Sequence, residues 1–416
     1  MKTSNGARER PILIAGAGIG GLVAALALLR RGFDVKIFEQ AAELREVGAG
    51  VQISPNGSRL LQAIGVLESV RSCACETEGK EVRLWNSGQT WKLFDLGAQA
   101  VKRYGFPYFT VYRVDLHNAL IDAVRREKPD AIELNARCIG LEQDSRGVTA
   151  IFDRGGQAQG CALIGADGIH SNVRSALFGA DKARYADLLA WRGVIPMEKV
   201  PAHLRRNVGT NWIGPGGHVI HYPLRRGELM NFVGYIERTG WIEESWNVQG
   251  TAAECAADFA AWHDDVQALV RSIGTPFKWG MVRRPALETW TQGRVTLLGD
   301  ACHAMFPFLA QGAVMAMEDG LILARCIEAD PGDMCGALHR YELARIGRTR
   351  RVVEGSAANV KRFHNLVLAD PVQAPLYVER EWATQRVQDR YDWIFDYDAA
   401  TVALDPAAAP QSEVAP

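Results

Sequence analysis

Apolar positions come in short blocks near the start of the chain, and glycines separate these blocks. Ile12–Ala15 is apolar throughout, which is typical of a buried strand, and the Ala- and Leu-rich segment from about Gly20 predicts a helix. A second strand is predicted at residues 34–38. Strand, glycine turn, helix and strand in this order predict a βαβ unit that binds a dinucleotide.

The same stretch has an alternative interpretation as a signal or membrane segment. Residues 11–29 are uncharged and largely apolar, they follow Arg8 and Arg10, and their length would allow either. The glycines at positions 16, 18, 20 and 21 divide the stretch into a strand and a helix, so we favour the folded unit.

Periodic patterns continue beyond this unit. They predict helices over residues 54–70, 115–126 and 341–363, and strands over residues 132–141 and 148–153. No internal repeat interrupts the series.

The pattern changes in the second half of the chain. Residues 188–236 consist of β segments joined by glycine turns at 214–217 and 225–227, which predicts an antiparallel sheet and a second domain. After Arg294 the sequence VTLLGD predicts a strand, and residues 312–328 predict a long helix. We therefore expect the nucleotide-binding domain to be completed by segments that are distant in the sequence.

Composition and charge narrow the class of protein. The chain has 416 residues, 48% hydrophobic and 23% charged, with a formal net charge of -1, which is typical of a soluble globular chain with two connected domains. This charge provides no basic surface for nucleic acid or for an acidic membrane, so we expect neither partner. The eight cysteines lack CxxC spacing, and the nine histidines lack HExxH spacing. We expect reduced thiols, no metal and a cytoplasmic location.

Three glycine-centred motifs carry the candidate chemistry. They are GAGIGG at residues 16–21, GADGIHSNVR at residues 165–174 and GDACHAMFPFLAQG at residues 299–312. The first is a weak signal by itself, since GxGxxG occurs in many nucleotide-binding proteins. No second GxGxxG follows, which argues against separate Rossmann domains for a flavin and a nicotinamide.

Each glycine of the first motif has a physical role. Gly16 allows the tight turn, Gly18 lets the backbone approach a pyrophosphate, and Gly21 lets the helix pack on the strand. Glu39 lies 18 residues beyond Gly21 and suits the acid that binds a ribose hydroxyl. The candidate dinucleotide site comprises Gly16, Gly18, Ile19, Gly21, Glu39 and Gln40.

Taken together, the three motifs resemble those of the single-component FAD-dependent aromatic hydroxylases. This group includes the salicylate, 3-hydroxybenzoate and 6-hydroxynicotinate monooxygenases and p-hydroxybenzoate hydroxylase. The resemblance covers almost the whole chain, and the segments WRGVIP, GPGGHVIHYPLR and YDWIFDYD resemble the salicylate hydroxylase branch most.

The resemblance implies an α/β fold of two domains. A Rossmann-like FAD-binding domain is interleaved with an antiparallel-sheet substrate domain, followed by C-terminal helices, as in p-hydroxybenzoate hydroxylase. The expected ranges are 1–75, 107–180 and 285–360 for the FAD-binding domain, 76–106 and 181–284 for the substrate domain, 361–404 for a helical segment and 405–416 for a disordered tail.

The resemblance also implies roles for residues of the other two motifs. Asp300 would bind the flavin ribityl hydroxyls, and Gly312 and Ala313 would open a helix that faces the flavin N1 and C2 carbonyl, where charge accumulates on reduction. Asp167 and Arg174 resemble a pair that braces the FAD pyrophosphate and helps to bind the nicotinamide donor, although a structural ion pair is an alternative. Other implied FAD contacts are Arg45, Gln52, Arg113 and Cys138.

Some of these implied contacts have plain alternatives. Arg45 and Arg113 could be solvated surface charges, and Cys138 could simply pack in the core. Gln52 stands where some relatives carry a histidine near the flavin, so no catalytic role is carried over to it.

The substrate side of the predicted site rests on one strand. Because side chains alternate along a strand, His218, Ile220 and Tyr222 face one side and His221 faces the other. The resemblance implies that His218 is the base, that Tyr222 hydrogen-bonds the substrate, and that Pro307 belongs to an apolar wall that excludes water. Four residues of extended chain span about 13 Å, so His218 and Tyr222 are expected at two edges of an aromatic substrate.

A base is expected because a phenolate ring accepts an electrophilic oxygen more readily than a neutral phenol. With a phenol pKa near 10 and an imidazole pKa near 6.5, the proton transfer is uphill by roughly 5 kcal/mol before the site acts. Hydrogen bonds to the phenolate, including one from Tyr222, must offset this cost, since burial alone opposes ionisation.

Another histidine, His303 of the GDACH segment, is expected to have a structural role and not a catalytic one.

These observations predict a monooxygenase with bound FAD that uses NADH or NADPH and O2 to hydroxylate a small aromatic acid. Salicylate, converted to catechol and CO2, is the first choice. The alternatives are 3-hydroxybenzoate 6-hydroxylation and 6-hydroxynicotinate 3-hydroxylation. From other classes, a nicotinamide dehydrogenase and a non-catalytic flavoprotein stay open. A homodimer is also open.

Overall fold

A six-stranded, mostly parallel sheet forms the centre of the first half of the molecule. The computed structural model describes residues 10–44, 49–181, 183–240 and 248–405. The strand order is β19-β20-β12-β1-β2-β8, in which β1 pairs in parallel with both β2 and β12. The strands are β1 (Ile12–Ala15), β2 (Val35–Phe38), β8 (Ile132–Glu133), β12 (Ala162–Gly165), β19 (Thr291–Gln292) and β20 (Val295–Leu297). Distant segments of the chain therefore complete this sheet, as the sequence predicts.

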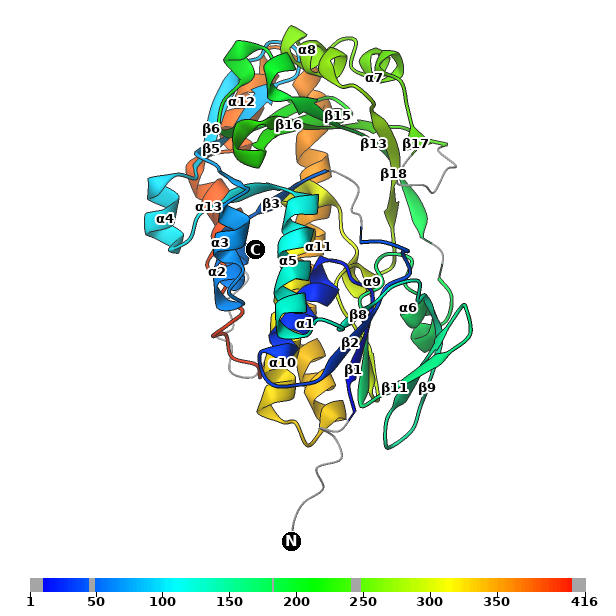
Figure 1. Ribbon diagram of the computed structural model, residues 1–416. Coiled ribbons are helices and arrows are strands. Elements are labelled where there is room, and N and C mark those ends of the chain that lie inside the picture. The colour runs from blue at the N-terminus through cyan, green and yellow to red at the C-terminus, as the bar shows by residue number, and fades with distance from the viewer. Residues whose placement is uncertain (1–9, 45–48, 182, 241–247, 406–416) are drawn as a thin grey trace.

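Helices pack beside this sheet and beside one another (Figure 1). They are α1 (Ile19–Leu29), α5 (Arg113–Glu127), α9 (Asp300–His303), α10 (Gly312–Ala329) and α11 (Met334–Phe363). Helix α1 is almost entirely buried, because it lies against both α5 and α10. A Cβ at Gly20 would meet Ala316 of α10, and one at Gly320 would meet the backbone of Ala24, so glycines let these two helices approach closely.

An eight-stranded sheet forms the second half, in the order β17-β18-β13-β16-β15-β14-β5-β6. Its strands are β5 (Gly79–Leu84), β6 (Thr90–Asp95), β13 (Arg184–Pro196), β14 (Val208–Gly214), β15 (Gly217–Leu224), β16 (Leu229–Glu237), β17 (Val248–Gln249) and β18 (Phe277–Arg283). The prediction of an antiparallel sheet over residues 188–236 is confirmed, and β5, from a distant segment, joins it by pairing in parallel with β14. Alternation shows which face a side chain takes, but not which strand is its neighbour.

The two faces of this sheet are covered differently. Helices α7 (Ala252–Asp258) and α8 (Asp264–Ser272) lie on one face over a core that includes Trp212, Val219 and Phe259. The other face carries Ile213 and Tyr235 and packs against the C-terminal part of the chain. That part includes α12 (Gln373–Glu381) and α13 (Thr384–Phe395).

Smaller elements connect the two sheets. Two three-stranded sheets are formed by β3 (Gly50–Ile53), β7 (Phe109–Tyr112) and β4 (Cys75–Glu76), and by β11 (Gln157–Gly160), β10 (Val148–Phe152) and β9 (Cys138–Gln143). The remaining α-helices of the described chain are α2 (Pro55–Ala63), α3 (Leu67–Arg71), α4 (Ala98–Tyr104) and α6 (Asn172–Phe178).

Two predicted elements prove to be interrupted. The helix predicted over residues 54–70 is two helices, α2 and α3, because Gly65 takes a positive φ of 60° that ends the first. The strand predicted over residues 132–141 is divided between β8 and β9, which belong to different sheets, and Asn135 at φ 56° turns the chain between them. Except for Asp405, the predicted tail at 405–416 lies outside the described residues.

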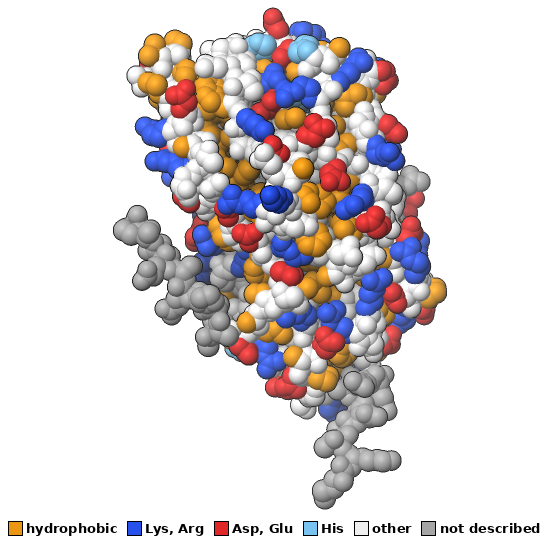
Figure 2. Space-filling view, turned by 90° about the vertical axis from the view of Figure 1, so that its left-hand side faces the viewer, with side chains coloured by type: hydrophobic (Ala, Val, Ile, Leu, Met, Phe, Trp, Pro, Cys, Tyr) orange, Lys and Arg blue, Asp and Glu red, His pale blue; other side chains and the backbone are white. Residues whose placement is uncertain are grey.

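The face shown in Figure 2 carries Lys and Arg side chains interspersed with Asp and Glu, and neither sign dominates it. None of the helices in the described part of the chain has the length and apolar character needed to cross a membrane.

Candidate active site

The glycine turn between β1 and α1 is shaped by close backbone contacts. Gly16 has a φ of 104°, and a Cβ there would clash with the carbonyl oxygen of Ala166. A Cβ at Gly21 would clash with the carbonyl oxygen of Gly16. Gly18 differs, because a Cβ there would meet nothing within 4 Å. No neighbour in the described part of the chain explains a glycine at 18, whereas the close approach of a pyrophosphate does.

A cavity of about 230 Å³ lies at the carboxyl ends of β1, β2 and β12. Dinucleotides bind at this edge of a parallel sheet. The cavity is lined by predicted site residues from four separate segments, namely Gly16, Gly18, Glu39, Gln40, Cys138 and Asp167. Glu39 accepts hydrogen bonds from the backbone nitrogens of Ala17 at 2.8 Å and Ala41 at 2.9 Å, so its carboxylate also holds the glycine turn.

Asp167 and Arg174 act separately. The Asp167 carboxylate accepts hydrogen bonds from Ser171 and from the backbone nitrogen of Asn172, which fixes the start of α6. Arg174 is buried and instead pairs with Asp181 at 2.7 Å, and it donates to the carbonyl oxygen of Ala301 at 3.2 Å. The alternative of an ion pair between Asp167 and Arg174 is therefore wrong, and Arg174 supports the segment that follows β20.

Cys138 is buried at the edge of the same cavity. Burial raises the pKa of its thiol to about 11, so the side chain is an uncharged part of the wall. Its backbone carbonyl oxygen accepts a hydrogen bond from the Asn172 side chain at 2.8 Å.

Asp300 faces an open space at the start of α9. Its side chain is exposed, although the protein packed around this space is dense enough to raise the pKa of the carboxyl group. The positive charges of His303 and then of Arg113, at the first turn of α5, oppose this shift. A carboxylate placed in this way suits hydrogen bonds to ligand hydroxyl groups.

The N-terminus of α10 lies at the end of the same motif. Gly312 and Ala313 are partly exposed first-turn residues, and α10 has no side-chain cap. Unpaired amides and the positive end of the helix dipole favour negative charge on a ligand. Before the helix, the 3-10 turn η5 (Pro307–Leu309) leads to Ala310, which has a φ of 55°.

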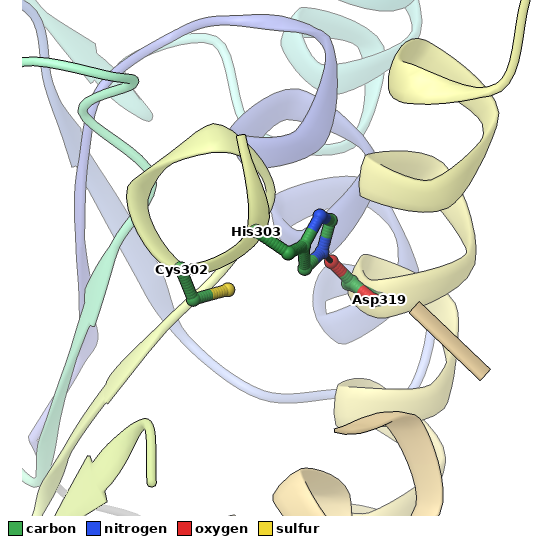
Figure 3. Close-up of side chains that lie close together, drawn as sticks. All are labelled: Cys302, His303 and Asp319. Carbon is green, nitrogen blue, oxygen red and sulfur yellow. Dashed lines mark hydrogen bonds and ion pairs between the residues drawn. The ribbon is translucent and has the colours of Figure 1, made fainter. Parts of the chain in front are cut away.

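An ion cluster fixes this motif from behind (Figure 3). The His303 imidazole points at Asp319, with 2.5 Å between Nε2 and Oδ2, and Arg345 pairs with the same carboxylate at 2.7 Å. Burial is the largest single effect and would lower the pKa of His303, but the charge and hydrogen bond of Asp319, together with those of Cys302, outweigh it and raise the pKa well above 6.5.

Cys302 completes a set of three groups that could hold a metal, since its sulfur and the ligand atoms of His303 and Asp319 lie within 4.8 Å of one another. We interpret this set as an ion cluster, because a protonated imidazole cannot bind a metal and the carboxylate already carries Arg345. This geometry gives His303 a structural contact.

A second cavity lies between the eight-stranded sheet, η5 and the C-terminal helices. The predicted site residues that line it are Gln52, Tyr222 and Pro307. Leu93, Phe308 and Leu309 add apolar walls. This is the place in the described chain where the predicted flavin-side and substrate-side residues meet.

A hydrogen-bonded series of side chains lines one wall of this second cavity. The Lys80 ammonium donates to the Tyr108 hydroxyl at 2.8 Å, and that hydroxyl donates to Gln52 Oε1 at 2.9 Å. Gln52 also hydrogen-bonds Tyr222. Burial lowers the pKa of Lys80 to about 7 and raises that of Tyr222, so the Tyr222 phenol stays protonated.

His218 does not line this cavity but lies directly behind its wall. It is fully buried, stacks on Tyr235 at 4.5 Å and touches Phe308 and Phe363, both of which line the cavity. The expectation that His218 and Tyr222 flank one ring therefore needs correction, because only Tyr222 is in the wall. Burial, and then the neighbouring His364, hold the pKa of His218 well below 6.5.

Two further predictions concern arginines. Arg45 lies outside the described residues. Arg113 begins α5, and its backbone nitrogen donates to the carbonyl oxygen of Ala49 at 2.9 Å.

Three residues of the site were not predicted from the sequence, namely Lys80, Tyr108 and His364. The alternation of β5 could have placed Lys80 on a face of the sheet, but no local pattern marks the other two.

The fold and the two cavities indicate a dinucleotide-binding enzyme with a second site against the large sheet. A model of the FAD-binding domain family matches residues 9–355, and the chain belongs to this family. The 3-amino-4-hydroxybenzoate 2-monooxygenase of Streptomyces platensis is 35% identical over 395 residues, covering 95% of this chain and 98% of that protein. The 3-hydroxybenzoate 6-hydroxylase of Polaromonas naphthalenivorans is 35% identical over 396 residues, with coverage of 95% and 98%.

Solved structures show the same architecture. Klebsiella pneumoniae HpxO complexed with FAD and uric acid has a TM-score of 0.79 at 26% identity, covering 92% of this chain and 98% of that one. A salicylate hydroxylase substrate complex has a TM-score of 0.78 at 24% identity, covering 94% and 96%, and shows the fold alone.

The chain is thus an FAD-dependent aromatic monooxygenase that uses NAD(P)H and O2. It lies in the branch of the 3-hydroxybenzoate 6-hydroxylases and 6-hydroxynicotinate 3-monooxygenases.

Proposed function

We propose that the enzyme hydroxylates a small phenolic aromatic carboxylic acid bound in the second cavity. The observation that carries this proposal is Lys80, a cation in a largely uncharged cavity with no acidic partner among the described residues. Glu81 also lines the cavity, but its carboxylate is already held by Arg83, Arg206 and Thr210. The charge that is available to a ligand is therefore positive.

A carboxylate on the substrate would complement this cation. Burial lowers the pKa of Lys80 to about 7, and an anion placed beside the ammonium would favour its charged form again. Binding of the acid and protonation of Lys80 would then reinforce each other.

The residues around the cofactor fit FAD. Gly16 and Gly18 leave the approach for the pyrophosphate, Asp300 is free for ligand hydroxyls, and the amides of Gly312 and Ala313 suit the flavin edge that becomes negative on reduction. When bound, FAD accepts a hydride from NADH or NADPH and supplies one oxygen atom of O2 to the ring.

The chain's own residues prepare the substrate. The Tyr222 phenol stays protonated and donates a hydrogen bond to the substrate hydroxyl as it ionises, and His218 takes up the proton. Pro307, Phe308 and Leu309 keep water from the reacting ring.

Among substrates, we place 3-hydroxybenzoate and related hydroxybenzoates first. The relatives that are 35% identical along almost the whole chain carry out hydroxylation of this kind. Salicylate, the first choice from the sequence, and 6-hydroxynicotinate, on which a 32% identical Pseudomonas fluorescens relative acts, follow.

The test is NADH and NADPH oxidation by the purified holoenzyme with each of these acids, with the product identified by mass spectrometry and NMR. We expect at least one acid to stimulate oxidation and to be recovered with one added oxygen. Lack of stimulation by every acid, in an enzyme that retains FAD, would reject this substrate class.

The assignment of chain segments to an FAD-binding domain and a substrate domain is part of the same proposal. Segments 1–75, 107–180 and 285–360 would hold FAD, and segments 76–106 and 181–284 would hold the substrate. In support, β5 and β6 from the first substrate segment lie in the same sheet as β13 to β18 from the second. A cytoplasmic location and a homodimer also stay proposals.

A further inference from the structure

His218 is the inner end of a hydrogen-bonded series that reaches the surface. Its Nδ1 lies 2.7 Å from Nε2 of His364, and Nδ1 of His364 lies 3.0 Å from a carboxylate oxygen of Glu237. His218 is fully buried and His364 nearly so, whereas the Glu237 side chain is 55% exposed.

We propose that Glu237, His364 and His218 form a proton relay that carries the proton of the substrate hydroxyl from the cavity wall to solvent. This proposal rests on the proposed function, because it assigns an exit to the proton that a phenolic substrate must lose. His218 is the inner end of the relay, directly behind the Phe308 and Phe363 side chains of the cavity wall, and His364 and Glu237 are positioning residues.

The hydrogen-bond pattern assigns the tautomers. A carboxylate can only accept, so His364 Nδ1 must carry a proton and donate it to Glu237. Neutral His364 then accepts at Nε2, and the donor in the next bond must be Nδ1 of His218. His218 is left with a bare lone pair at Nε2, which is the form that a base requires.

This lone pair has no partner in the described protein. Nε2 of His218 is buried and makes no hydrogen bond, although buried polar atoms are rarely left unpaired. The ring touches Phe308 and Phe363, which line the substrate cavity, so a ligand hydroxyl is the partner that this position suits.

The backbone holds the three residues in line. His364 caps the C-terminus of α11, and its carbonyl oxygen accepts a hydrogen bond from the nitrogen of Gly216 at 3.1 Å. The carbonyl oxygen of Gly216 in turn accepts from the nitrogen of Glu237 at 2.8 Å. The turn between β14 and β15 therefore ties the end of α11 to the end of β16.

The proton can pass along the three residues without leaving a stable positive charge on either buried histidine. The substrate O–H bond breaks and a bond from the proton to Nε2 of His218 forms. The Nδ1 proton of His218 passes to Nε2 of His364, and the Nδ1 proton of His364 passes to Glu237, which releases it to water. Because the low pKa of His218 opposes a lasting imidazolium, passing the proton on suits this residue better than storing it.

Glu237→Gln is the central variant. The glutamine amide can still accept a hydrogen bond from His364 Nδ1 through its oxygen, but it cannot take up a proton, so the relay loses its outer acceptor. Glu228→Gln is the matched control, because Glu228 is exposed at the other end of the same strand and has no place in the relay. His364→Gln tests the middle position.

We expect kcat to fall about tenfold in Glu237→Gln and His364→Gln, with KM changed less than twofold and bound FAD retained. The loss should shrink as the pH rises, because a phenol with a pKa near 10 then ionises without the relay. The titratable groups that face His218 and His364 are Tyr235 and Glu237, so Tyr235→Phe should be included. An unchanged kcat and pH profile in both relay variants would overturn the proposal.

A second measurement needs no substrate. In holoenzyme labelled with 15N at histidine, NMR should show the His218 proton on Nδ1 and none on Nε2, both in the wild type and in Glu228→Gln. A protonated Nε2 in the wild type would also overturn the relay. Because this readout is independent of turnover, an enzyme that hydroxylates none of the acids would reject the proposed function while still testing the relay.

Discussion

Lys80 and Tyr108 are joined twice: the ammonium group donates to the phenolic hydroxyl at 2.8 Å and lies 4.8 Å from the centre of the same ring. Both contacts hold the ammonium at the cavity wall. A flexible side chain thus becomes a fixed anchor, at a position where a substrate carboxylate could be recognised.

Replacing this cation should therefore weaken substrate binding. We expect Lys80→Met to raise KM for a hydroxybenzoate about tenfold or more, with a smaller change in kcat, since a charged hydrogen bond contributes about 1.5–3 kcal/mol. Lys80→Arg keeps the charge and serves as the control. Steady-state kinetics would contradict the assignment if Lys80→Met and wild type had equal KM values.

The reacting side of the cavity gives a second prediction. Tyr222→Phe and His218→Ala should retain FAD but lower the yield of hydroxylated product per NADH, with kcat reduced about tenfold to a hundredfold, because each loses a proton-transfer or hydrogen-bonding group. His203→Ala, at an exposed histidine of the same half of the molecule, is the control. Product yield is measured by chromatography against NADH consumed. Full coupling and an unchanged kcat in both variants would show that neither side chain takes part in proton transfer to or from the substrate.

Two substitutions in the glycine turn should distinguish an effect on cofactor binding from an effect on folding. A Cβ at Gly18 meets nothing within 4 Å, so Gly18→Ala should leave the melting temperature of the FAD-free protein unchanged while weakening FAD binding. Gly21→Ala should lower that melting temperature, because its Cβ would clash with the backbone of Gly16. Thermal melts without FAD, followed by FAD titration, distinguish the two. Equal FAD affinity in Gly18→Ala and wild type would argue against pyrophosphate contact there.

The ion cluster behind the flavin motif predicts a pH dependence of stability. Its histidine, His303, has a pKa raised well above 6.5 in the folded state. Its contribution is therefore complete below about pH 6.5, the ordinary pKa of histidine in the unfolded chain, and is lost as the pH rises through the folded value.

We expect the free energy of unfolding at saturating FAD to fall above pH 6.5, by at most about 1.4 kcal/mol per pH unit from this group. His303→Gln should be less stable at pH 6 and should lose less between pH 6.5 and 9. The exposed His339→Gln is the control. Parallel pH curves for wild type and His303→Gln would contradict the assignment.

The sequence predicts the cofactor half well, because that half depends on local geometry. Gly16, Gly18 and Gly21 specify a turn within six residues, and Glu39 follows at the end of the next strand. Each of these constraints lies within one βαβ unit, so a pattern in the sequence can express it.

The substrate half depends on contacts between distant segments. Lys80 reaches the cavity because β5 pairs in parallel with β14, and His364 meets His218 across 146 residues. Alternation correctly places Tyr222 toward the cavity, but it cannot show that Phe308 and Phe363 stand in front of His218. Such contacts follow from packing alone.

Helix α11 contacts residues of both halves of the molecule. Near its middle, Arg345 and Arg348 pair with Asp319 and Glu318 of α10, and at its end His364 contacts His218. Figure 1 shows the length of this helix. A helix of 30 residues is about 45 Å long and resists bending. The same stiff helix therefore supports both the ion cluster behind the flavin motif and the histidine pair behind the substrate cavity.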